Sequence, residues 1–553
     1  MYLKRDTLFK LPKAKRLRSS IAALAMAGAA SIPVASAQAE DVLRVAMTAA
    51  DIPINIGQPD QGFEGFRFMG YMLYDTLVLW DLSKSGQPAS LTPGLAESWA
   101  VDPANPERWV FKLRKGVKFS NGNDFTADDV LFSYKRMSDK DAQMKINLAS
   151  IKEARKVGDH TVEFITRAPN PILTGRLNSF FIMDKEWSEA NGATKVTVMS
   201  GDEQRVSPAG QTAMGTGPFA ITERTAQVKT TLVPNKNWWG KSNHNLTKVT
   251  MTPVKQDATR VAALLSGELD MAYPIPTQDI KRVNSNNGTA VLVGPELRTI
   301  FLFMEQGVDK LFGTDIKNPF QDVRVRKALY HSINIEAIKK KIMRNLATPS
   351  AIMISPKLFD RAGDFARYAY DPNMAKKLLS DAGYAGGLTA RFDCPNDRYV
   401  NDEQICQAVT SMAAKVGIKL NLTAKPKAQY FKQVLNPKSR DYHVGLIGWT
   451  PGSFDSHNVV INLIASFNEK AKTGRYNLSN HTDARIDQLT PMIQSESNKA
   501  KRDAMIAEVY KRVHDNVYFI PLHQQALAWG KRDNVALKQR GDNVFRFRYV
   551  TIN

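Results

Sequence analysis

Apolar and polar positions alternate between residues 109 and 133 in a way that predicts a strand, a turn and a helix. Residues 109–115 read Trp-Val-Phe-Lys-Leu-Arg-Lys, and this two-residue period is typical of a half-buried strand. Asn-Gly-Asn at 121–123 marks a turn. Thr126 precedes an apolar run and Asp129 follows three residues later, so the pair predicts a capping box. This pattern alone fits any α/β unit.

Three later segments also carry clear helix boundaries. Asp322, Asn334 and Asp371 each stand where a side chain can accept from an exposed amide at the start of a helix. Pro372 suits the first helical position, and Gly383 suits the residue after the last turn. We therefore predict helices that begin at these caps, the last of them ending near Gly383.

The first 39 residues have the three-part layout of an export signal. Basic residues occupy positions 4–18, a short apolar run follows at 21–30, and an Ala-x-Ala site ends at Ala37 or Ala39. The apolar run is shorter than the roughly 20 residues that span a bilayer, which disfavours a permanent anchor. No Cys stands near the cleavage site, so we expect no lipid anchor. We expect a removable signal peptide over 1–39 and a soluble chain in a Gram-negative periplasm.

The net charge is strongly positive but does not indicate nucleic-acid binding. The whole chain carries +21. Residues 1–39 hold seven Lys and Arg residues and one Asp, so their removal leaves +15. The remaining basic residues are scattered among acidic ones, and no nucleic-acid motif accompanies them. We interpret the excess as a solvated surface that can help encounters with anionic membrane faces.

The chain has two cysteines, Cys394 and Cys406. An exported protein with two Cys residues fits one disulfide, and the alternative is a pair of free buried thiols, which an oxidising compartment disfavours. A zinc site would need more ligands nearby, and this segment has none, so we expect no metal.

Sequence motifs of enzymes are absent. No Gly-x-Ser-x-Gly elbow, His-Glu-x-x-His helix or phosphate-binding loop occurs, and the eight His residues show no ligand spacing. Gly215-x-Gly217 superficially matches a dinucleotide fingerprint, but the residues that follow alternate like a strand instead of opening a helix. We therefore expect no catalysis and no cofactor.

Several motifs together carry a family resemblance, and they are spaced along the whole chain after the leader. They are Leu95–Trp99, Trp109–Phe119 and Phe125–Tyr134, Gly-Thr-Gly-Pro-Phe at 215–219, Asn-Trp-Trp-Gly at 237–240, Gly-Glu-Leu-Asp at 267–270, and the helical blocks at 320–329 and 371–384. In wording and order they resemble family 5 of the bacterial solute-binding proteins, the dipeptide, oligopeptide and nickel class that serves ABC importers. This resemblance, and not the periodicity, carries the functional inference.

The resemblance implies an α/β fold, a bilobal periplasmic-binding-protein clamshell of the large class. The first lobe is expected to be discontinuous, with an extra domain inserted in it, and ligand is expected to lie between the lobes. The implied boundaries are residues 40–73, 215–295 and 520–553 for the first lobe, 74–214 for the extra domain, and 296–519 for the second lobe.

The segment 445–458 is the sharpest candidate for ligand contact, because an apolar strand delivers Trp449 and then a Gly/Pro/Ser turn. In peptide-binding members an Asp in this turn pairs with the peptide's ammonium, but here Gly452 takes that place. Either Asp455 takes over, or the ligand presents no free amine there. Asp455 can also be a turn residue that satisfies its own backbone. Trp449 is either a cleft wall or part of the core.

The segment 394–399 falls where the family places an Arg that clamps the ligand's carboxylate. Arg398 is the candidate, since a guanidinium is bidentate and permanently charged, with Tyr399 beside it. An ordinary surface Arg is the alternative. Phe63 and Phe66 are further candidates for the first-lobe wall.

The resulting hypothesis is a periplasmic protein that captures a short peptide and delivers it to a membrane-embedded ABC permease and its ATPase subunits. We expect it to act as a monomer. The same fold with a non-peptide cargo (nickel chelate, haem or opine) is the first alternative, which Gly452 favours. A secreted hydrolase is the lesser one.

Overall fold

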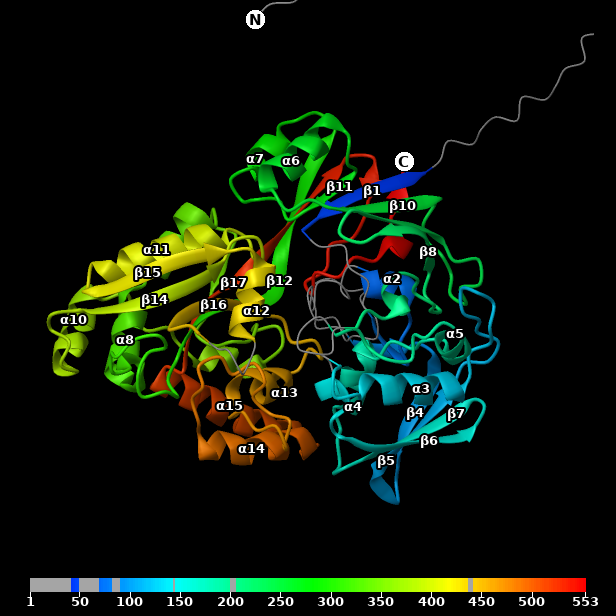
Figure 1. Cartoon of the computed structure of the whole chain (residues 1–553), viewed down its shortest axis with the longest axis horizontal. Helices are drawn as coiled ribbons and strands as arrows, with labels where there is room; N and C mark the ends of the chain where they lie inside the picture. The colour runs from blue at the N-terminus through cyan, green and yellow to red at the C-terminus, as the bar shows by residue number, and fades with distance from the viewer. Residues whose placement is uncertain (1–40, 49–68, 82–89, 143–144, 199–204, 436–440) are drawn as a thin grey trace, which may run out of the picture. The chain divides into compact units, whose positions relative to one another are not determined.

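The computed structural model describes six stretches of the chain: residues 41–48, 69–81, 90–142, 145–198, 205–435 and 441–553 (Figure 1). Phe63, Phe66 and the expected signal peptide lie outside the described residues. No helix in the described stretches is long and apolar enough to cross a membrane.

Two long antiparallel strands form the centre of the fold. They are β12 (Thr289–Met304) and β17 (Phe519–Arg532), and they pair from Thr289 with Arg532 to Phe303 with Phe519. The pairing shifts register between Pro295 and Thr299. This irregularity divides each of the two strands into two halves. One lobe of the protein is built on each half.

The first lobe extends the sheet beyond the amino-terminal half of β12. Its strands are β1 (Val42–Met47), β8 (Phe219–Thr225), β9 (Lys229–Pro234), β10 (Lys248–Pro253) and β11 (Met271–Tyr273). Its helices are α2 (Tyr71–Leu73), α6 (Asp257–Ser266) and α7 (Ile280–Asn284). The chain ends in a small ribbon of β18 (Val535–Ala536) and β19 (Thr551–Ile552).

A separate four-stranded antiparallel sheet occupies the sequence between α2 and β8. Its strands are β4 (Ala96–Asp102), β5 (Asn105–Leu113), β6 (Ile151–Gly158) and β7 (Thr161–Thr166). Beside it stand β2 (Val78–Asp81) and β3 (Ser90–Pro93), and the helices α3 (Ala127–Met137), α4 (Leu173–Arg176) and α5 (Lys185–Ala190).

The second lobe extends the sheet from the other half of β12. Its strands are β13 (Thr348–Pro349), β14 (Leu388–Pro395), β15 (Ile418–Lys425) and β16 (Val444–Trp449). Its helices are α8 (Val323–Ser332), α9 (Ile335–Ala337), α10 (Pro372–Asp381), α11 (Asp402–Ala414), α12 (Lys427–Val434), α13 (Ser456–Val459), α14 (Ala484–Ser495) and α15 (Lys499–Asn516). The full sheet order is β15-β14-β16-β12-β17-β11-β1-β10-β9-β8.

The buried apolar side chains form separate clusters in the two lobes. The largest cluster joins the first lobe to the four-stranded sheet and contains no residue between Tyr273 and Leu527. Two other clusters lie within residues 300–522 and fill the second lobe. Each lobe therefore has its own hydrophobic core, and the expected two-lobe α/β architecture is confirmed. The exact domain boundaries stay a prediction.

The local predictions of the helix and strand boundaries are confirmed. Thr126 and Asp129 form the capping box of α3. Asp322, Asn334 and Asp371 cap α8, α9 and α10. The strand predicted at 109–115 is the end of β5, with Trp109, Phe111 and Leu113 buried.

Candidate ligand-binding site

Three chain segments meet at one edge of the second-lobe sheet. Strands β14 and β16 are parallel, with Phe392 opposite Val444, so their carboxyl ends lie on the same side. Strand β12 is antiparallel to β16 and places Thr299 opposite Trp449. The loop after β14, the turn after β16 and the register shift of β12 therefore lie close together, where the two lobes join.

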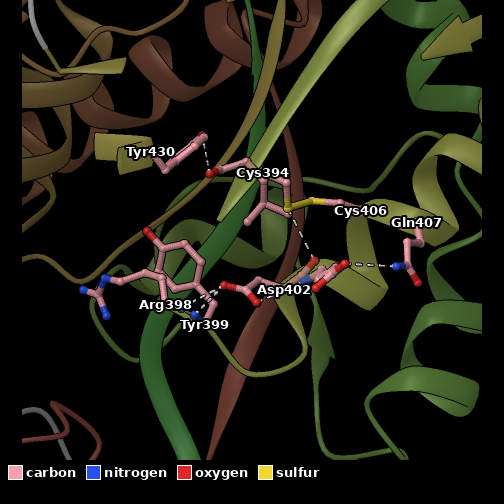
Figure 2. The surroundings of a disulfide bond; sticks show 9 residues. Cys394, Arg398, Tyr399, Asp402, Cys406, Gln407 and Tyr430 are labelled. Carbon is pink, nitrogen blue, oxygen red and sulfur yellow. Dashed lines mark hydrogen bonds between the residues drawn. A yellow bond between two sulfur atoms is a disulfide. The ribbon is translucent and has the colours of Figure 1, made fainter. Parts of the chain in front are cut away.

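A disulfide fastens the first of these segments. Cys394 at the end of β14 is bonded to Cys406 in α11, which confirms the predicted pair (Figure 2). Between them, Asp402 accepts hydrogen bonds from the amides of Arg398 and Tyr399, both at 2.9 Å. Burial raises the pKa of Asp402 to about 7, although these amides oppose the shift. The loop 395–401 is thus held from both ends.

This loop presents the predicted pair Arg398 and Tyr399 (Figure 2). Tyr399 is buried and its hydroxyl donates to the Gly448 carbonyl oxygen at 3.4 Å. A Cβ at Gly448 would stand 2.8 Å from the Tyr399 ring, so this close approach requires glycine. The half-buried Arg398 guanidinium lies 5.0 Å from the Tyr399 ring centre and extends away from the disulfide.

A buried polar group at the register shift of β12 faces the same loop. The Nε of Arg298 donates to Glu296 at 3.0 Å, and Gln525 of β17 donates to the other Glu296 oxygen at 2.6 Å. Gln525 also accepts from the Val400 amide at 3.1 Å. Burial lowers the pKa of Arg298, but Glu296 and Tyr399 more than offset it, so the guanidinium stays charged. We call Glu296, Arg298 and Gln525 the hinge cluster.

Trp449 ends β16 and lies at the boundary between cleft and core. It is half-buried, its Nε1 donates to the Asn458 side chain at 2.9 Å, and its ring lies 5.1 Å from that of Tyr476. It also packs against a second-lobe core cluster. Both roles that the sequence left open are therefore compatible with its position.

Asp455 is engaged by its own lobe. Its carboxylate caps α13 by accepting from the His457 amide at 2.7 Å. The guanidinium of Arg502 donates to both oxygens, at 2.6 and 2.8 Å. These contacts match the turn alternative stated for this residue, and an incoming ammonium would compete with Arg502. The role of Asp455 as an ammonium partner stays a prediction.

The turn after β16 contacts the first lobe, a contact that no sequence pattern predicts. Asn178 donates to the Gly452 carbonyl oxygen at 2.9 Å. The rings of Trp80 and Phe454 lie 4.7 Å apart. Phe454 has a φ of +51°, a left-handed conformation that is unusual for a bulky residue.

A buried guanidinium adds to this contact. Arg176 of α4 lies with Nη2 2.6 Å from Nδ1 of His457, whose Nε2 lies 3.0 Å from the Thr490 carbonyl oxygen. Because a carbonyl only accepts, His457 carries its proton on Nε2 and accepts from Arg176. Burial and then Arg176 lower the pKa of His457 well below 6.5, so the ring is neutral. We call Arg176, Asn178, Trp80 and their partners His457, Gly452 and Phe454 the rim contact.

One cavity at the junction of the lobes is small. This cavity of about 50 Å³ is lined from the first lobe by Thr48, Asp257, Pro274 and Pro276, and from the second lobe by residues 396–397 and 399–404. Lys427 of the second lobe also reaches the Thr48 carbonyl oxygen at 3.2 Å. Since a water molecule takes about 30 Å³ of liquid volume, this cavity has room for one or two waters and not for a peptide. The described residues also contain no group of three metal-ligating side chains.

The comparisons with known proteins agree on one family. The sequence profile of "Bacterial extracellular solute-binding proteins, family 5 Middle" matches residues 90–471. Heme-binding protein A of Haemophilus influenzae is 25% identical over 455 residues, covering 78% of each chain. The dipeptide-binding protein of Escherichia coli is 27% identical over 421 residues, covering 71% of this chain and 73% of its own.

A solved structure shows the same fold. It is the ABC transporter-associated periplasmic binding protein DppA of Helicobacter pylori, in complex with the peptide STSA. The TM-score is 0.78 at 23% identity, over 92% of this chain and 98% of that one. At this level of identity the likeness establishes the architecture.

Proposed function

The chain belongs to family 5 of the bacterial extracellular solute-binding proteins, and we propose that it captures a short peptide between its two lobes and delivers it to an ABC importer. The observation that carries this proposal is the pair of separate cores joined by β12 and β17, with a second inter-lobe contact at the rim. A protein built this way can open at one contact while the other holds. The peptide cargo is supported by the dipeptide- and STSA-binding relatives.

The proposed work is differential binding. A ligand that touches both lobes stabilises the closed state by the difference between its affinities for the closed and the open protein. ATP hydrolysis belongs to other subunits. On the second lobe, we assign the ligand contacts to Arg398, Tyr399, Trp449 and Asp455, and on the first lobe to Phe63 and Phe66.

The proposal includes the cleavage of a signal peptide and the location of the mature protein. Residues 1–39 would be a signal peptide, removed after Ala37 or Ala39, and the mature protein would act as a periplasmic monomer. The domain boundaries at 73, 214, 295 and 519 belong to the same proposal. Amino-terminal sequencing of the protein from periplasm decides the cleavage site, and a chain that begins at Met1 would refute it.

A non-peptide cargo is the second candidate, because Gly452 replaces the expected carboxylate and because a relative is named for haem. Nickel chelates and opines belong to the same alternative. Hydrolysis is a lesser candidate, which incubation with peptides and analysis of products would detect.

Native mass spectrometry of the protein purified from its own periplasm tests the proposal directly. We expect a mass increment that corresponds to a short peptide and that disappears after unfolding and refolding. An increment from haem or a metal chelate would replace the peptide by the alternative cargo. A preparation that binds no peptide from a defined tripeptide mixture would contradict the proposal.

A further inference from the structure

The carboxyl-terminal segment 540–548 lies against the candidate site on the first-lobe side. Asn543 in this segment donates to the Tyr273 hydroxyl at 2.6 Å. The guanidinium of Arg546 stands 4.0 Å over the ring of Tyr71. The Tyr71 hydroxyl donates to the main-chain oxygen of Asn178 at 2.9 Å, and Asn178 holds Gly452 of the rim contact. Arg546 is therefore linked to the turn after β16 through two residues.

Within the described part of the chain, this segment gathers three Arg residues and one ion-pairing carboxylate, that of Asp542. Arg540 and Arg546 expose only 8% of their surface, and Arg548 is half-buried nearby. Arg540 forms an ion pair with Asp542. Burial, then Arg548 and Arg540, lower the pKa of Arg546 to about 9, which shows that the guanidinium groups repel one another.

A second described carboxyl group near the segment, that of Asp75, does not offset this charge. Asp75 is buried, and it accepts from Trp239 Nε1 at 2.8 Å and from the Thr216 hydroxyl at 3.3 Å. Burial raises the pKa of Asp75, although Arg548 and Arg546 oppose the shift. Asp75 thus accepts its hydrogen bonds from Trp239 and Thr216 and not from the Arg residues of the segment. Burial disfavours its negative charge.

Several donors of these guanidinium groups have no acceptor in the part of the chain that the structure describes. Among the described residues, no acceptor lies within hydrogen-bond distance of Arg546 Nε, Arg540 Nη1 or Arg548 Nε, and these atoms are shielded from solvent. A buried donor without a partner is costly, so folded proteins rarely keep one unless a ligand or ion completes it. Three such donors in one short segment point to an anionic partner.

We propose that Arg546 and Arg540 form a site for an acidic group of the cargo, a carboxylate or another planar oxyanion, on the first-lobe wall of the cleft. This inference rests on the proposed function. A guanidinium suits the role because its fork of donors matches two oxygens of one acidic group. The opposite wall is consistent with it, since Gly452 carries no charge and Asp455 is bound to Arg502. The wall that carries Arg546 thus selects for an acidic group of the cargo.

Calorimetric titration with matched probes tests the site. The probes are the tripeptides Ala-Glu-Ala and Ala-Gln-Ala, the carboxyl-terminal amide of each, and inorganic phosphate. The proteins are wild type, Arg546→Gln, Arg546→Lys and the control Arg155→Gln, whose Arg is exposed and pairs with Glu153 at 2.6 Å on a distant strand. We expect wild type and the control to bind the acidic member of a pair at least about tenfold more tightly. Arg546→Gln should remove that preference, and Arg546→Lys should keep part of it.

A second readout separates this role from a structural one. Without ligand, Arg546→Gln should unfold at the same or a higher temperature than wild type, because it removes a repelled buried charge. A structural Arg would instead lower the unfolding temperature with and without ligand, and that result would overturn the site. So would an unchanged preference for acidic probes in Arg546→Gln.

The measurements with inorganic phosphate distinguish a failure of the peptide proposal from a failure of the anion-site inference. If no tripeptide binds but phosphate raises the unfolding temperature of wild type and not of Arg546→Gln, the peptide cargo is wrong and the anion site stands. If tripeptides bind without any preference for acidic members, the peptide cargo stands and the inference is wrong. Phosphate binding that depends on Arg546 without any acidic preference among bound tripeptides would identify a free-ion site and overturn the cargo role.

Discussion

Among the described residues, the two lobes meet at the hinge cluster and at the rim contact, and these two connections are chemically different. At the hinge cluster the chain itself crosses between the lobes, and the buried Arg298 is paired with the carboxylate of Glu296. At the rim contact the lobes touch without a shared strand. The buried Arg176 there meets the neutral ring of His457, and no carboxylate in the described part of the chain forms an ion pair with it.

This difference indicates which connection can open. A buried cation with a neutral partner gives up solvation without a full compensating charge, and burial lowers the pKa of Arg176 to about 10. Separating the rim contact returns Arg176 to water, whereas separating the hinge would break a ladder of strand hydrogen bonds and a buried ion pair. We infer that the hinge stays closed in every state and that ligand decides the state of the rim.

The largest effect is expected from breaking the hinge cluster. Glu296→Gln removes the charge that compensates Arg298 and should lower the free energy of unfolding by about 3–5 kcal/mol, because the remaining charge stays buried. Urea denaturation followed by circular dichroism measures it. The control Asp364→Asn breaks an exposed pair with Arg361 and should cost at most about 1 kcal/mol. Equal costs for both variants would contradict the structural role assigned to Glu296.

The disulfide should have the next largest effect. Replacing both Cys394 and Cys406 by Ala opens a loop closed across 12 positions, for which chain entropy gives about 3 kcal/mol. The loss should appear in the unfolding of the second lobe, and it should not depend on whether the rim contact is intact. An unchanged denaturation midpoint would show that the bond does not stabilise the wall that carries Arg398.

Acid should weaken the hinge strand through His523. Burial, and then Arg367, lower the pKa of this residue to about 3, whereas an unfolded His titrates near 6.5. The unfolded state therefore binds the proton first as the pH falls. The contribution of neutral His523 to the free energy of unfolding is complete above about pH 6.5 and declines toward pH 3. At pH 5 it is smaller by about 2 kcal/mol than above pH 6.5.

The test compares wild type with His523→Gln at pH 5 and pH 7.5. Asp402 and Asp129 have pKa values raised by burial to about 7 and about 6, so they change stability in the opposite direction. The difference between the two proteins isolates His523, and wild type should lose more stability at pH 5. Parallel pH profiles would refute this assignment.

The smallest effect is expected at the rim. Asn178→Ala removes the hydrogen bond to Gly452, which exists only when the lobes touch, so affinity for cargo should fall by about 1 kcal/mol, or roughly fivefold. Unfolding of the ligand-free protein should barely change. Asn191→Ala, on an exposed helix end, is the control. If Asn178→Ala lowered stability and left affinity unchanged, the rim would be structural.

Local features of the chain were readable from its sequence. The capping box at Thr126 and Asp129 needs only neighbours three residues apart, and α10 has its cap and first Pro next to each other. The disulfide was also predictable, because an exported chain with two cysteines has one possible pairing. The family motifs gave the two-lobe architecture.

Contacts between segments that are distant in the chain could not be predicted from the sequence. Arg176 and His457 are 281 positions apart, and Asn178 and Gly452 are 274 apart. In the sequence Arg176 is one cation among many, and nothing beside it marks it as buried. Asp455 could be recognised as a polar turn residue, but its partner Arg502 lies 47 positions away. Local patterns do not determine which long-range partner a charge meets.

Hydrogen exchange of the loaded and the emptied protein tests the central claim most directly. The loaded form is the protein as purified from periplasm, and the emptied form is the same protein after unfolding and refolding without cargo. We predict that cargo increases amide protection at residues 173–180 and 450–458, the two sides of the rim contact. Protection of β12 and β17 should be the same in both forms. Equal protection of the rim in both forms, or a loss confined to the hinge strands, would contradict a clamshell that opens at the rim.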